Sequence, residues 1–330
     1  MKTTLPIGNI FLLPHERYNW MHEFSGGPGV NGRTIACPRG RLMGGCTSVN
    51  GTVYMRGHPL DYDEWAALTG DDSWRWEAVL PLFKRSEDHH AGPNDTHGHA
   101  GEWRVEPQRL RWDILESFAQ AAVAAGIPRT RDFNTGDNFG VGYFEVNQKK
   151  GVRWNASKAF LRPVLGRHNL TVVTGAHVKR LTLAQGRCTG LVYELGGREV
   201  TVAAGEEVVL AAGAVNSPHL LELSGIGAPA VLAACGLPVA HALPGVGENL
   251  QDHLQLRSVY KVSNVRTLNT RAASWLLLSP AIWRAVRPAP VAGWRLSQRA
   301  KKASRSTAPT RPSRVAAWPP QRPTIAWPSL

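Results

Sequence analysis

Residues 208–227 constrain the fold of this 330-residue chain more than any other segment. A short apolar run ends at Gly213, and Ser217 and Pro218 stand where a helix would begin. Serine is a favoured N-cap and proline a favoured first-turn residue, while Gly225 is placed to end the helix. A strand, a glycine turn and a capped helix suit the phosphate-binding edge of an α/β sheet.

The residues before this segment predict a β-meander. Short runs rich in valine, leucine and threonine alternate with glycines, as is typical of strands and their turns. The predicted strands are residues 170–174, 177–183, 188–195, 199–203 and 207–212.

Helices are predicted in the first half of the chain. Apolar residues at helical spacing indicate helices in residues 58–65, 73–80 and 114–125. We expect Asp113 to cap the last of these and Gly126 to end it. One face of that helix is expected to pack in the core; it carries Leu115, Phe118, Ala119, Ala122 and Val123.

A second informative stretch is glycine-rich and covers residues 40–57. Its glycines stand among small hydroxyl and thiol residues, so the backbone could approach a large flat ligand closely. By composition alone an ordinary loop would be the simpler interpretation. In contrast, residues 27–32 match Gly-x-Gly-x-x-Gly but lack the strand and helix that make this a dinucleotide fingerprint, and we expect a surface loop there.

The net charge of +13 is unevenly distributed. No Asp or Glu follows Asp252, whereas that part holds 14 Lys and Arg; residues 1–252 hold 24 basic and 25 acidic residues. Basicity therefore belongs to the end of the chain. Because no ordered basic groove with stacking aromatics is evident, nucleic acid is not the expected partner.

Neither a membrane span nor a secretory signal is visible, so the expected location is the cytoplasm, with peripheral membrane association as the alternative. The four cysteines lack metal-site or disulfide spacing, and reduced thiols are expected. The densest histidine cluster comprises His89, His90, His97 and His99. A metal site is conceivable there, but a flexible turn separates these residues, and we expect a loop rather than a ligand set.

Together these segments resemble the glucose-methanol-choline oxidoreductases, which are FAD-dependent alcohol oxidases and dehydrogenases. Residues 213–227 fit the family pattern closely; residues 40–57 fit with Met43 and Cys46 as departures. Further likenesses lie at residues 18–20, 156–161, 169–178 and 243–253. The resemblance extends over about residues 5–260, and its motif order is most like the choline dehydrogenase type.

The resemblance implies an incomplete Rossmann-like FAD-binding domain of α/β class with part of a substrate domain. Its cofactor parts would be about residues 1–88 and 165–255, with a substrate-side part at 89–164, and residues 261–287 are unassigned. The cofactor-contacting residues it implies are Leu42, Gly44, Gly45, Cys46, Thr47, Asn50, Gly51, Thr52, Val53, Val178 and Gly213. The implied substrate is a small alcohol, whose hydride would pass to FAD.

Parts of the family pattern have no counterpart here. The true glycine fingerprint belongs before residues 18–20, and the catalytic histidine belongs well after residue 260. We therefore predict no catalytic residue, since His253 lies in a different motif and His219 is expected to pack on its helix. No metal ligands are predicted either, and little activity is expected without the base.

Residues 288–330 contain eight prolines, eight basic residues and three tryptophans without acid or periodicity. We expect a disordered basic tail, and a reading-frame shift near Pro288 would explain its composition. Two alternatives to an oxidoreductase stay open: a non-catalytic remnant, and a module whose basic tail binds nucleic acid. The sequence leaves the alcohol, the electron acceptor and the oligomeric state undetermined.

Overall fold

The computed structural model describes residues 6–252, 259–265 and 267. Met1–Arg287 forms one compact unit and Pro288–Leu330 another, and the second lies outside the described residues. The predicted tail, His253 and residues 268–287 lie outside the described residues. Within the described residues, no helix is long and apolar enough to cross a membrane.

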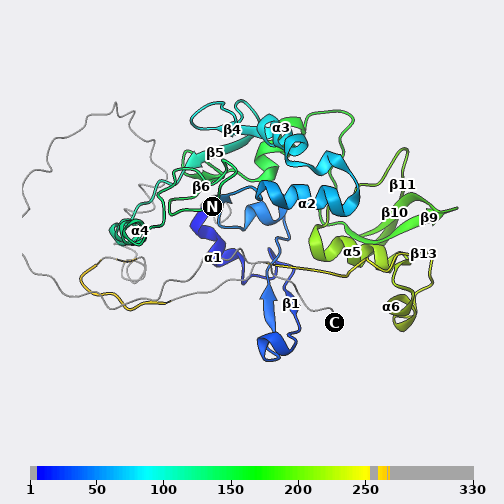
Figure 1. Cartoon of the computed structure of the whole chain (residues 1–330). Coiled ribbons are helices and arrows are strands. Elements are labelled where there is room, and N and C mark those ends of the chain that lie inside the picture. The colour runs from blue at the N-terminus through cyan, green and yellow to red at the C-terminus, as the bar shows by residue number, and fades with distance from the viewer. Residues whose placement is uncertain (1–5, 253–258, 266, 268–330) are drawn as a thin grey trace, which may run out of the picture. The chain divides into compact units, whose positions relative to one another are not determined.

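A four-stranded sheet forms the centre of the first half of the chain (Figure 1). Its order is β3 (Val53–Tyr54), β6 (Glu145–Val146), β5 (Trp103–Pro107) and β4 (Glu87–His89). β4 and β5 pair in parallel, whereas the other pairs are antiparallel. Val105 and Val146 of this sheet are buried, so the sheet contributes one part of the hydrophobic core.

The helices predicted in residues 58–65 and 73–80 are present as α2 (Pro59–Thr69) and α3 (Trp76–Ser86). A capping box begins α2: the Leu60 N–H donates to Nδ1 of His58, and the Asp61 carboxylate accepts from the His58 N–H. Figure 1 shows the two helices side by side near β4. Apolar residues at helical spacing were thus sufficient to predict both helices.

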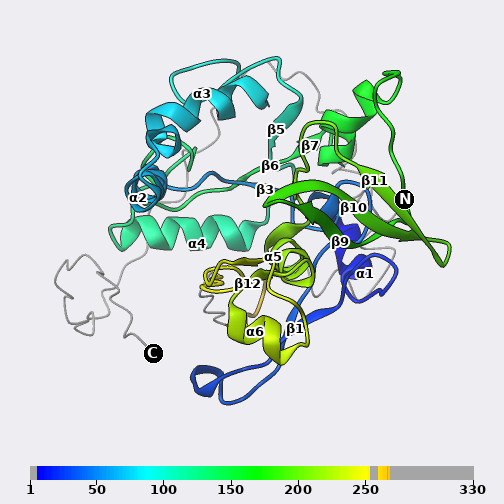
Figure 2. The same ribbon diagram turned by 90° about the vertical axis from the view of Figure 1, so that its right-hand side faces the viewer.

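A second sheet is an antiparallel meander of β9 (His177–Ala184), β10 (Arg187–Leu195) and β11 (Arg198–Ala203). These three strands were predicted. Helix α5 (Gly213–Leu223) packs against β9, as Figures 1 and 2 show. The side chains of Leu181, Val192 and Leu220 are buried there and form a second part of the core.

The strands predicted at residues 170–174 and 207–212 are wrong. Neither segment contains a strand, because no neighbouring strand in the described part of the chain pairs with it. A strand needs a ladder partner as well as a β-prone sequence. The two segments are irregular, and most of their residues are exposed.

Helix α5 begins earlier than predicted, at Gly213 rather than after Ser217. The Ser217 hydroxyl does not cap a new helix; it accepts a hydrogen bond from the Ala212 N–H (3.1 Å) and so closes the first turn. The helix ends at Leu223, and Gly225 follows with φ +80°, as expected for a helix-ending glycine.

Helix α4 (Asp113–Ala124) is present, but two expectations about it are wrong. Asp113 is its first helical residue; Trp112 occupies the N-cap without a side-chain hydrogen bond. Ala119 is buried, whereas Leu115, Phe118 and Val123 are exposed. The apolar periodicity predicted the helix correctly, but the structure places little against that face within the described residues. Gly126 follows the helix with φ +91°.

The remaining elements are short. Strands β1 (His22–Phe24) and β2 (Ile35–Cys37) form a hairpin whose loop contains the Gly-x-Gly-x-x-Gly match, so that match lies on a surface loop as predicted. The other elements are α1 (Asn9–Leu12), β7 (Gln148–Lys149), β8 (Val152–Arg153), α6 (Pro229–Ala234), β12 (Ile226–Gly227), β13 (His241–Ala242), and the single turns Pro6–Gly8, Pro28–Val30, Gly45–Ser48, Asp72–Trp74, Ser157–Leu161 and Arg162–Val164.

Candidate functional site

The glycine-rich stretch is fixed at its start by the segment before β1. Trp20 donates its N–H to the Arg39 carbonyl (2.9 Å), and Arg41 donates to the Tyr18 carbonyl (2.8 Å). The buried side chain of Asn19 accepts from the Arg39 N–H (2.9 Å). The guanidinium of Arg41 lies over the Trp20 ring, 4.7 Å from its centroid. Residues 18–20 therefore act as the support on which the glycine-rich stretch begins.

Within the stretch, the chain folds back on itself where only glycine fits. Gly44 has φ +87°, and a Cβ there would lie 2.6 Å from the Ser48 hydroxyl oxygen. A Cβ at Gly40 would lie 2.5 Å from the Gly45 carbonyl oxygen. Glycine is the only residue that adopts such a conformation at such separations without strain. The sequence uses its glycines to pack this loop closely.

The glycine-rich stretch is held in place by a buried arginine, Arg153. Arg153, at the end of β8, is fully buried and donates to the Thr47 carbonyl (3.1 Å), the Asn50 side-chain oxygen (2.8 Å) and the Pro6 carbonyl (3.2 Å). Burial lowers the pKa of Arg153 to about 10. Asn155 adds a hydrogen bond from its amide to the Ser48 hydroxyl (2.7 Å).

A cavity of about 630 Å³ lies over this loop; we call it the glycine-loop cavity. Four segments contribute to its lining: Trp20 and His22 at β1, the glycine-rich stretch with Arg39, the residues entering β9, and the start of α5 with the two residues before it. Its volume is within the range of small-molecule sites in proteins. It brings together the two sequence segments that predicted a cofactor, 40–57 and 208–227.

The charged side chains of the cavity lining are basic and stand among apolar ones. Arg39 and Arg41 line it, as do His22 and His177, and its lining contains no Asp or Glu. Nε2 of His22 is buried and has no hydrogen-bond partner among the described residues. The amino-terminal end of α5, which carries a partial positive charge, also faces the cavity. Such a surface favours an anionic ligand with several acceptor oxygens, such as a pyrophosphate.

The predicted cofactor residues divide into two groups. Leu42, Gly45, Cys46 and Gly213 line the cavity. The others do not line it; they are Gly44, Thr47, Asn50, Gly51, Thr52, Val53 and Val178.

Several residues of the second group have identifiable structural roles. Thr47 and Asn50 accept from Arg153 through a backbone carbonyl and a side-chain oxygen, respectively. Thr52 is buried, and its hydroxyl accepts from the Gln148 amide (2.9 Å). Val178 lies within β9 opposite Tyr193, and its neighbour His177 lines the cavity instead.

Some residues that shape the site were not singled out from the sequence. Arg39, Arg41 and His177 lie beside named motifs, and their charge next to a glycine-rich loop was an available signal. Arg153 carries no such signal, because it acts from more than a hundred residues away in the chain. Only the fold places it under the loop.

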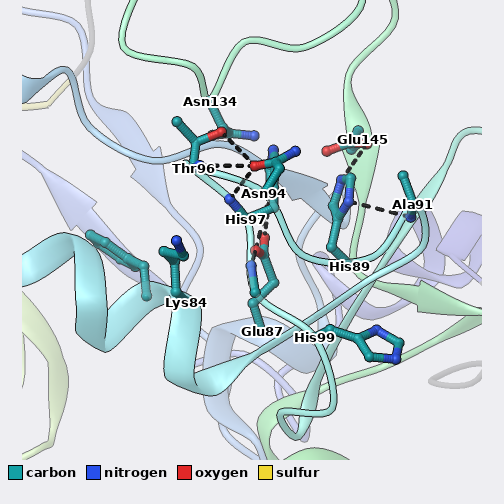
Figure 3. A network of polar contacts seen from close by, with 12 residues as sticks. Lys84, Glu87, His89, Ala91, Asn94, Thr96, His97, His99, Asn134 and Glu145 are labelled. Atoms are coloured by element: carbon teal, nitrogen blue, oxygen red, sulfur yellow. Dashed lines mark hydrogen bonds and ion pairs between the residues drawn. The ribbon is translucent and has the colours of Figure 1, made fainter.

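A second polar group of residues lies beside the four-stranded sheet. We call it the histidine cluster: His89, His90, His97, Glu87, Asp132 and Glu145. His97 is fully buried; its Nδ1 lies 3.0 Å from a Glu87 oxygen and its Nε2 2.8 Å from Asp132. Figure 3 shows Glu87 at one end of the His97 ring and Glu145 beside His89. Glu145 Oε1 lies 2.9 Å from Nε2 of both His89 and His90.

The expectation of a flexible turn that leaves these imidazoles unaimed is wrong. Residues 90–102 are mostly loop, yet His89 and His97 are buried and stack with their ring centroids 3.8 Å apart. Carboxylates supplied by distant residues hold the rings. Arg56 completes the cluster through an ion pair to Glu87 (3.0 Å) in which both side chains are buried.

Protonation of His97 follows from this geometry. Burial alone would lower the pKa of His97, but its hydrogen bonds to Asp132 and Glu87 raise it to about 9. Burial would raise the pKa of Glu145, whereas the hydrogen bonds from His89 and His90 lower it to about 2. Ligand atoms of His89, His97 and Glu145 lie within 4.8 Å of one another, close enough for one metal ion. Both ring nitrogens of His97 lie at hydrogen-bond distance from carboxylates. We therefore interpret the cluster as joined by hydrogen bonds and ion pairs.

Comparison with known proteins identifies a family. Residues 19–255 match the model of the GMC oxidoreductases. Among curated proteins, the oxygen-dependent choline dehydrogenase of Photobacterium profundum is 39% identical over 271 residues, which are 81% of this chain and 47% of that protein. The chain spans about half the length of the curated relatives it matches.

Solved structures agree with the sequence comparison. Pyridoxine 4-oxidase from Mesorbium loti matches with a TM-score of 0.73 and 35% identity, over 76% of this chain and 50% of that one. An FAD-dependent oxidoreductase from Chaetomium thermophilum matches with a TM-score of 0.65 and 29% identity, over 71% and 43% of the two chains. The mixed α/β fold described above is therefore shared with FAD-binding domain structures, as predicted.

Proposed function

The chain belongs to the GMC oxidoreductase family, and from this we propose that its glycine-loop cavity is one wall of an FAD site in an enzyme that oxidises an alcohol group. Bound FAD would accept a hydride from the alcohol carbon. The substrate is proposed as a small alcohol because the relatives' names include choline and pyridoxine, which both carry hydroxyl groups.

One observation carries the proposal: a cavity of suitable size joins the glycine-rich stretch, two arginines and the start of α5, with no carboxylate in its lining. Gly45 and Gly213 line the cavity, and a Cβ at either would meet no atom within 4 Å, so both leave the backbone bare where a ligand would lie. Arg39 and Arg41 would bind the pyrophosphate oxygens. Leu42 and Cys46 would contact the flat part of the ligand, and the buried Arg153 would keep the loop in shape.

The remaining predicted residues stay predictions: Gly44, Thr47, Asn50, Gly51, Thr52, Val53 and Val178 act through the loop's conformation or the β9 strand rather than by lining the cavity. The same holds for the division into cofactor parts at 1–88 and 165–255 and a substrate-side part at 89–164. We assign no catalytic base, and we propose that the chain alone has little oxidase activity because a base in place supplies about a hundredfold or more in rate.

The test is equilibrium binding of FAD to the purified 330-residue chain, followed by quenching of flavin fluorescence. We expect saturable binding that ADP competes for, since the arginines face the pyrophosphate. The variant Arg41→Glu should weaken the affinity about tenfold or more, because it replaces a pyrophosphate donor with a like charge.

A matched control is Arg198→Glu, which makes the same change on the exposed face of β11. It should leave the affinity for FAD unchanged. Absence of saturable binding, or equal effects of the two variants, would contradict the assignment of the cavity.

A further inference from the structure

The dipeptide Asn-Gly occurs twice in the sequence, at residues 31–32 and 50–51, and a valine precedes it both times. In this dipeptide the glycine nitrogen can attack the carbonyl carbon of the asparagine side chain, because glycine has no side chain to obstruct the approach. The reaction closes a succinimide ring and releases ammonia. Since the two sites share the sequence Val-Asn-Gly, a large difference in their reactivity has to come from the fold.

At the second site, hydrogen bonds activate the side chain that would be attacked. Oδ1 of Asn50 accepts from Nη1 of Arg153 (2.8 Å) and from the Thr52 N–H (3.1 Å). When a nitrogen adds to an amide carbonyl, negative charge develops on the carbonyl oxygen, and donors that are already in place stabilise it. The hydrogen bond from a guanidinium is especially strong because it is assisted by charge. The two donors therefore form an oxyanion hole around Oδ1 of Asn50.

The attacking and leaving groups of this site are free to react. Neither the Gly51 N–H nor Nδ2 of Asn50 makes a hydrogen bond within the described residues. Both residues are exposed, so solvent can take up the proton of the attacking nitrogen and supply water for hydrolysis. The space around Gly51 is also open, since a Cβ there would meet no atom within 4 Å.

The first site lacks these features. The Gly32 N–H already donates to the Gly27 carbonyl (3.2 Å), which occupies the nitrogen that would attack. The side-chain oxygen of Asn31 accepts no hydrogen bond from another part of the described chain. Asn31 is exposed in the loop between β1 and β2. It therefore provides an internal reference with the same local sequence and no activating donors.

The charge of Arg153 also favours the product of the reaction. Arg153 is fully buried, and within the described residues its side chain donates to neutral oxygens of Thr47, Asn50 and Pro6 and to no carboxylate. A buried charge without an opposite charge is costly. Hydrolysis of the succinimide leaves a carboxylate at position 50, where it supplies the missing counter-charge of the guanidinium.

We propose that Asn50 is a site of self-catalysed deamidation, in which Arg153 and the Thr52 N–H stabilise the oxyanion. The Gly51 nitrogen forms a bond to Cγ of Asn50 and loses its proton to solvent. The Cγ–Nδ2 bond then breaks, and Nδ2 takes up a proton and leaves as ammonia. Water adds to either carbonyl of the succinimide and yields aspartate or isoaspartate. Nothing is oxidised or reduced, and water is the co-reactant.

The experiment follows both Asn-Gly sites in one sample. The purified 330-residue chain is incubated at mildly alkaline pH without FAD, and peptide mapping by mass spectrometry measures deamidation and isoaspartate at each site. In the folded chain we expect Asn50 to react about tenfold or more faster than Asn31, because the oxyanion donors are present only at Asn50. In concentrated urea the two rates should be similar, since only the shared local sequence remains.

Variants assign the effect to the arginine. Arg153→Met should slow deamidation of Asn50 about tenfold, because it removes the charged donor, whereas Arg153→Lys should retain part of the rate. Gly51→Ala should also slow the reaction, since its methyl group obstructs the attacking nitrogen without meeting another atom of the fold. The rate at Asn31 should be unchanged in all of these variants. Circular dichroism verifies that each variant retains its fold.

Two outcomes would overturn the inference. One is a rate at Asn50 in the folded chain that is equal to or lower than the rate at Asn31. The other is faster deamidation of Asn50 in a folded Arg153→Met variant, which would show that the arginine restrains the side chain instead of activating it. If Arg153→Met does not fold, the comparison of the two sites in the folded and unfolded wild-type chain still decides. None of these measurements depends on flavin binding.

Discussion

The histidine cluster and two segments without backbone hydrogen bonds among the described residues, 171–176 and 205–211 (the unpaired segments), handle polar groups in opposite ways. In the cluster, buried charges find partners within the chain: Glu87 with Arg56 and His97, and His97 with Asp132. In the unpaired segments, the backbone donors and acceptors of residues 171–176 and 205–211 have no partner within the described chain. The first region satisfies its polar groups with its own side chains, whereas the second leaves its backbone groups to solvent within the described residues.

This difference locates stability and function in separate places. Buried ion pairs joined by hydrogen bonds are costly to break, so the cluster should unfold only with the sheet around it. Open segments cost little while they are solvated, but they leave the glycine-loop cavity bordered by unpaired backbone. We therefore expect the four-stranded sheet to resist local unfolding more strongly than residues 171–176 and 205–211 beside the glycine-loop cavity.

The largest expected effect tests whether the cluster is self-sufficient. His97→Ala removes the group between two carboxylates and leaves Glu87 and Asp132 facing each other. Breaking a buried pair in this way costs about 3–5 kcal/mol of unfolding free energy. His99→Ala, whose side chain is 55% exposed and only near Asp88, should cost less than about 1 kcal/mol. Urea denaturation of both variants measures these changes. Similar losses of unfolding free energy would show that the buried contacts of His97 contribute no more than an exposed histidine does.

The effect of pH on the unfolding free energy, through the same cluster, should be somewhat smaller. The pKa of His97 is raised to about 9 in the fold, above its unfolded value near 6.5, so its contribution is complete below pH 6.5 and disappears as pH rises through 9. Between pH 6 and pH 10 the unfolding free energy should fall by roughly 3 kcal/mol on this account. The variant His97→Gln should lose this part of the pH dependence; an unchanged slope would refute the protonated state.

At the acid end the sign is reversed. Hydrogen bonds from His89 and His90 lower the pKa of Glu145 to about 2, against the effect of burial. Its contribution is therefore complete above about pH 4.5 and is lost as pH falls toward 2. The cluster should be most stabilising between these two limits.

The two regions also differ in how far the sequence predicted them. Helices α2 and α3 and strands β9, β10 and β11 follow from local apolar periodicity and β-prone runs bounded by glycines, and they were predicted. Residues 170–174 and 207–212 have equally clear β patterns, yet they form no strand. A local pattern predicts readiness to pair, whereas pairing itself needs a neighbour that the pattern does not contain.

The candidate site shows the same limit. The family was predicted from residues 40–57 and 213–227, and the structure brings these segments to one cavity. Arg153 and the carboxylates around His97 were missed because their partners lie far away in sequence; Asp132 and His97, for example, are 35 residues apart. Long-range polar contacts leave no periodic trace in the chain.

A further prediction concerns the buried arginine that supports the glycine-rich stretch. Arg153→Met keeps much of the volume but removes the donors to Thr47, Asn50 and Pro6. Loss of charged hydrogen bonds of this kind should cost about 2–3 kcal/mol. The affinity for FAD should also fall, because the loop would lose its shape. Arg153→Lys should retain part of both. If stability falls while binding is unchanged, the loop does not depend on this cation.

The smallest expected effect comes from replacing glycines of the glycine-rich stretch with alanine. It separates the cost of backbone strain from the effect of adding a methyl group. Gly44→Ala forces a residue with a Cβ into φ +87° and places that Cβ 2.6 Å from the Ser48 oxygen, so we expect a loss of about 1–2 kcal/mol. Gly51→Ala lies in the same stretch, has no positive φ and meets no atom within 4 Å; it should change stability by less than about 0.5 kcal/mol. Thermal denaturation and FAD titration of the pair give the answer. Equal losses of stability and affinity in the two variants would show that the shape of the loop does not depend on the left-handed conformation at Gly44.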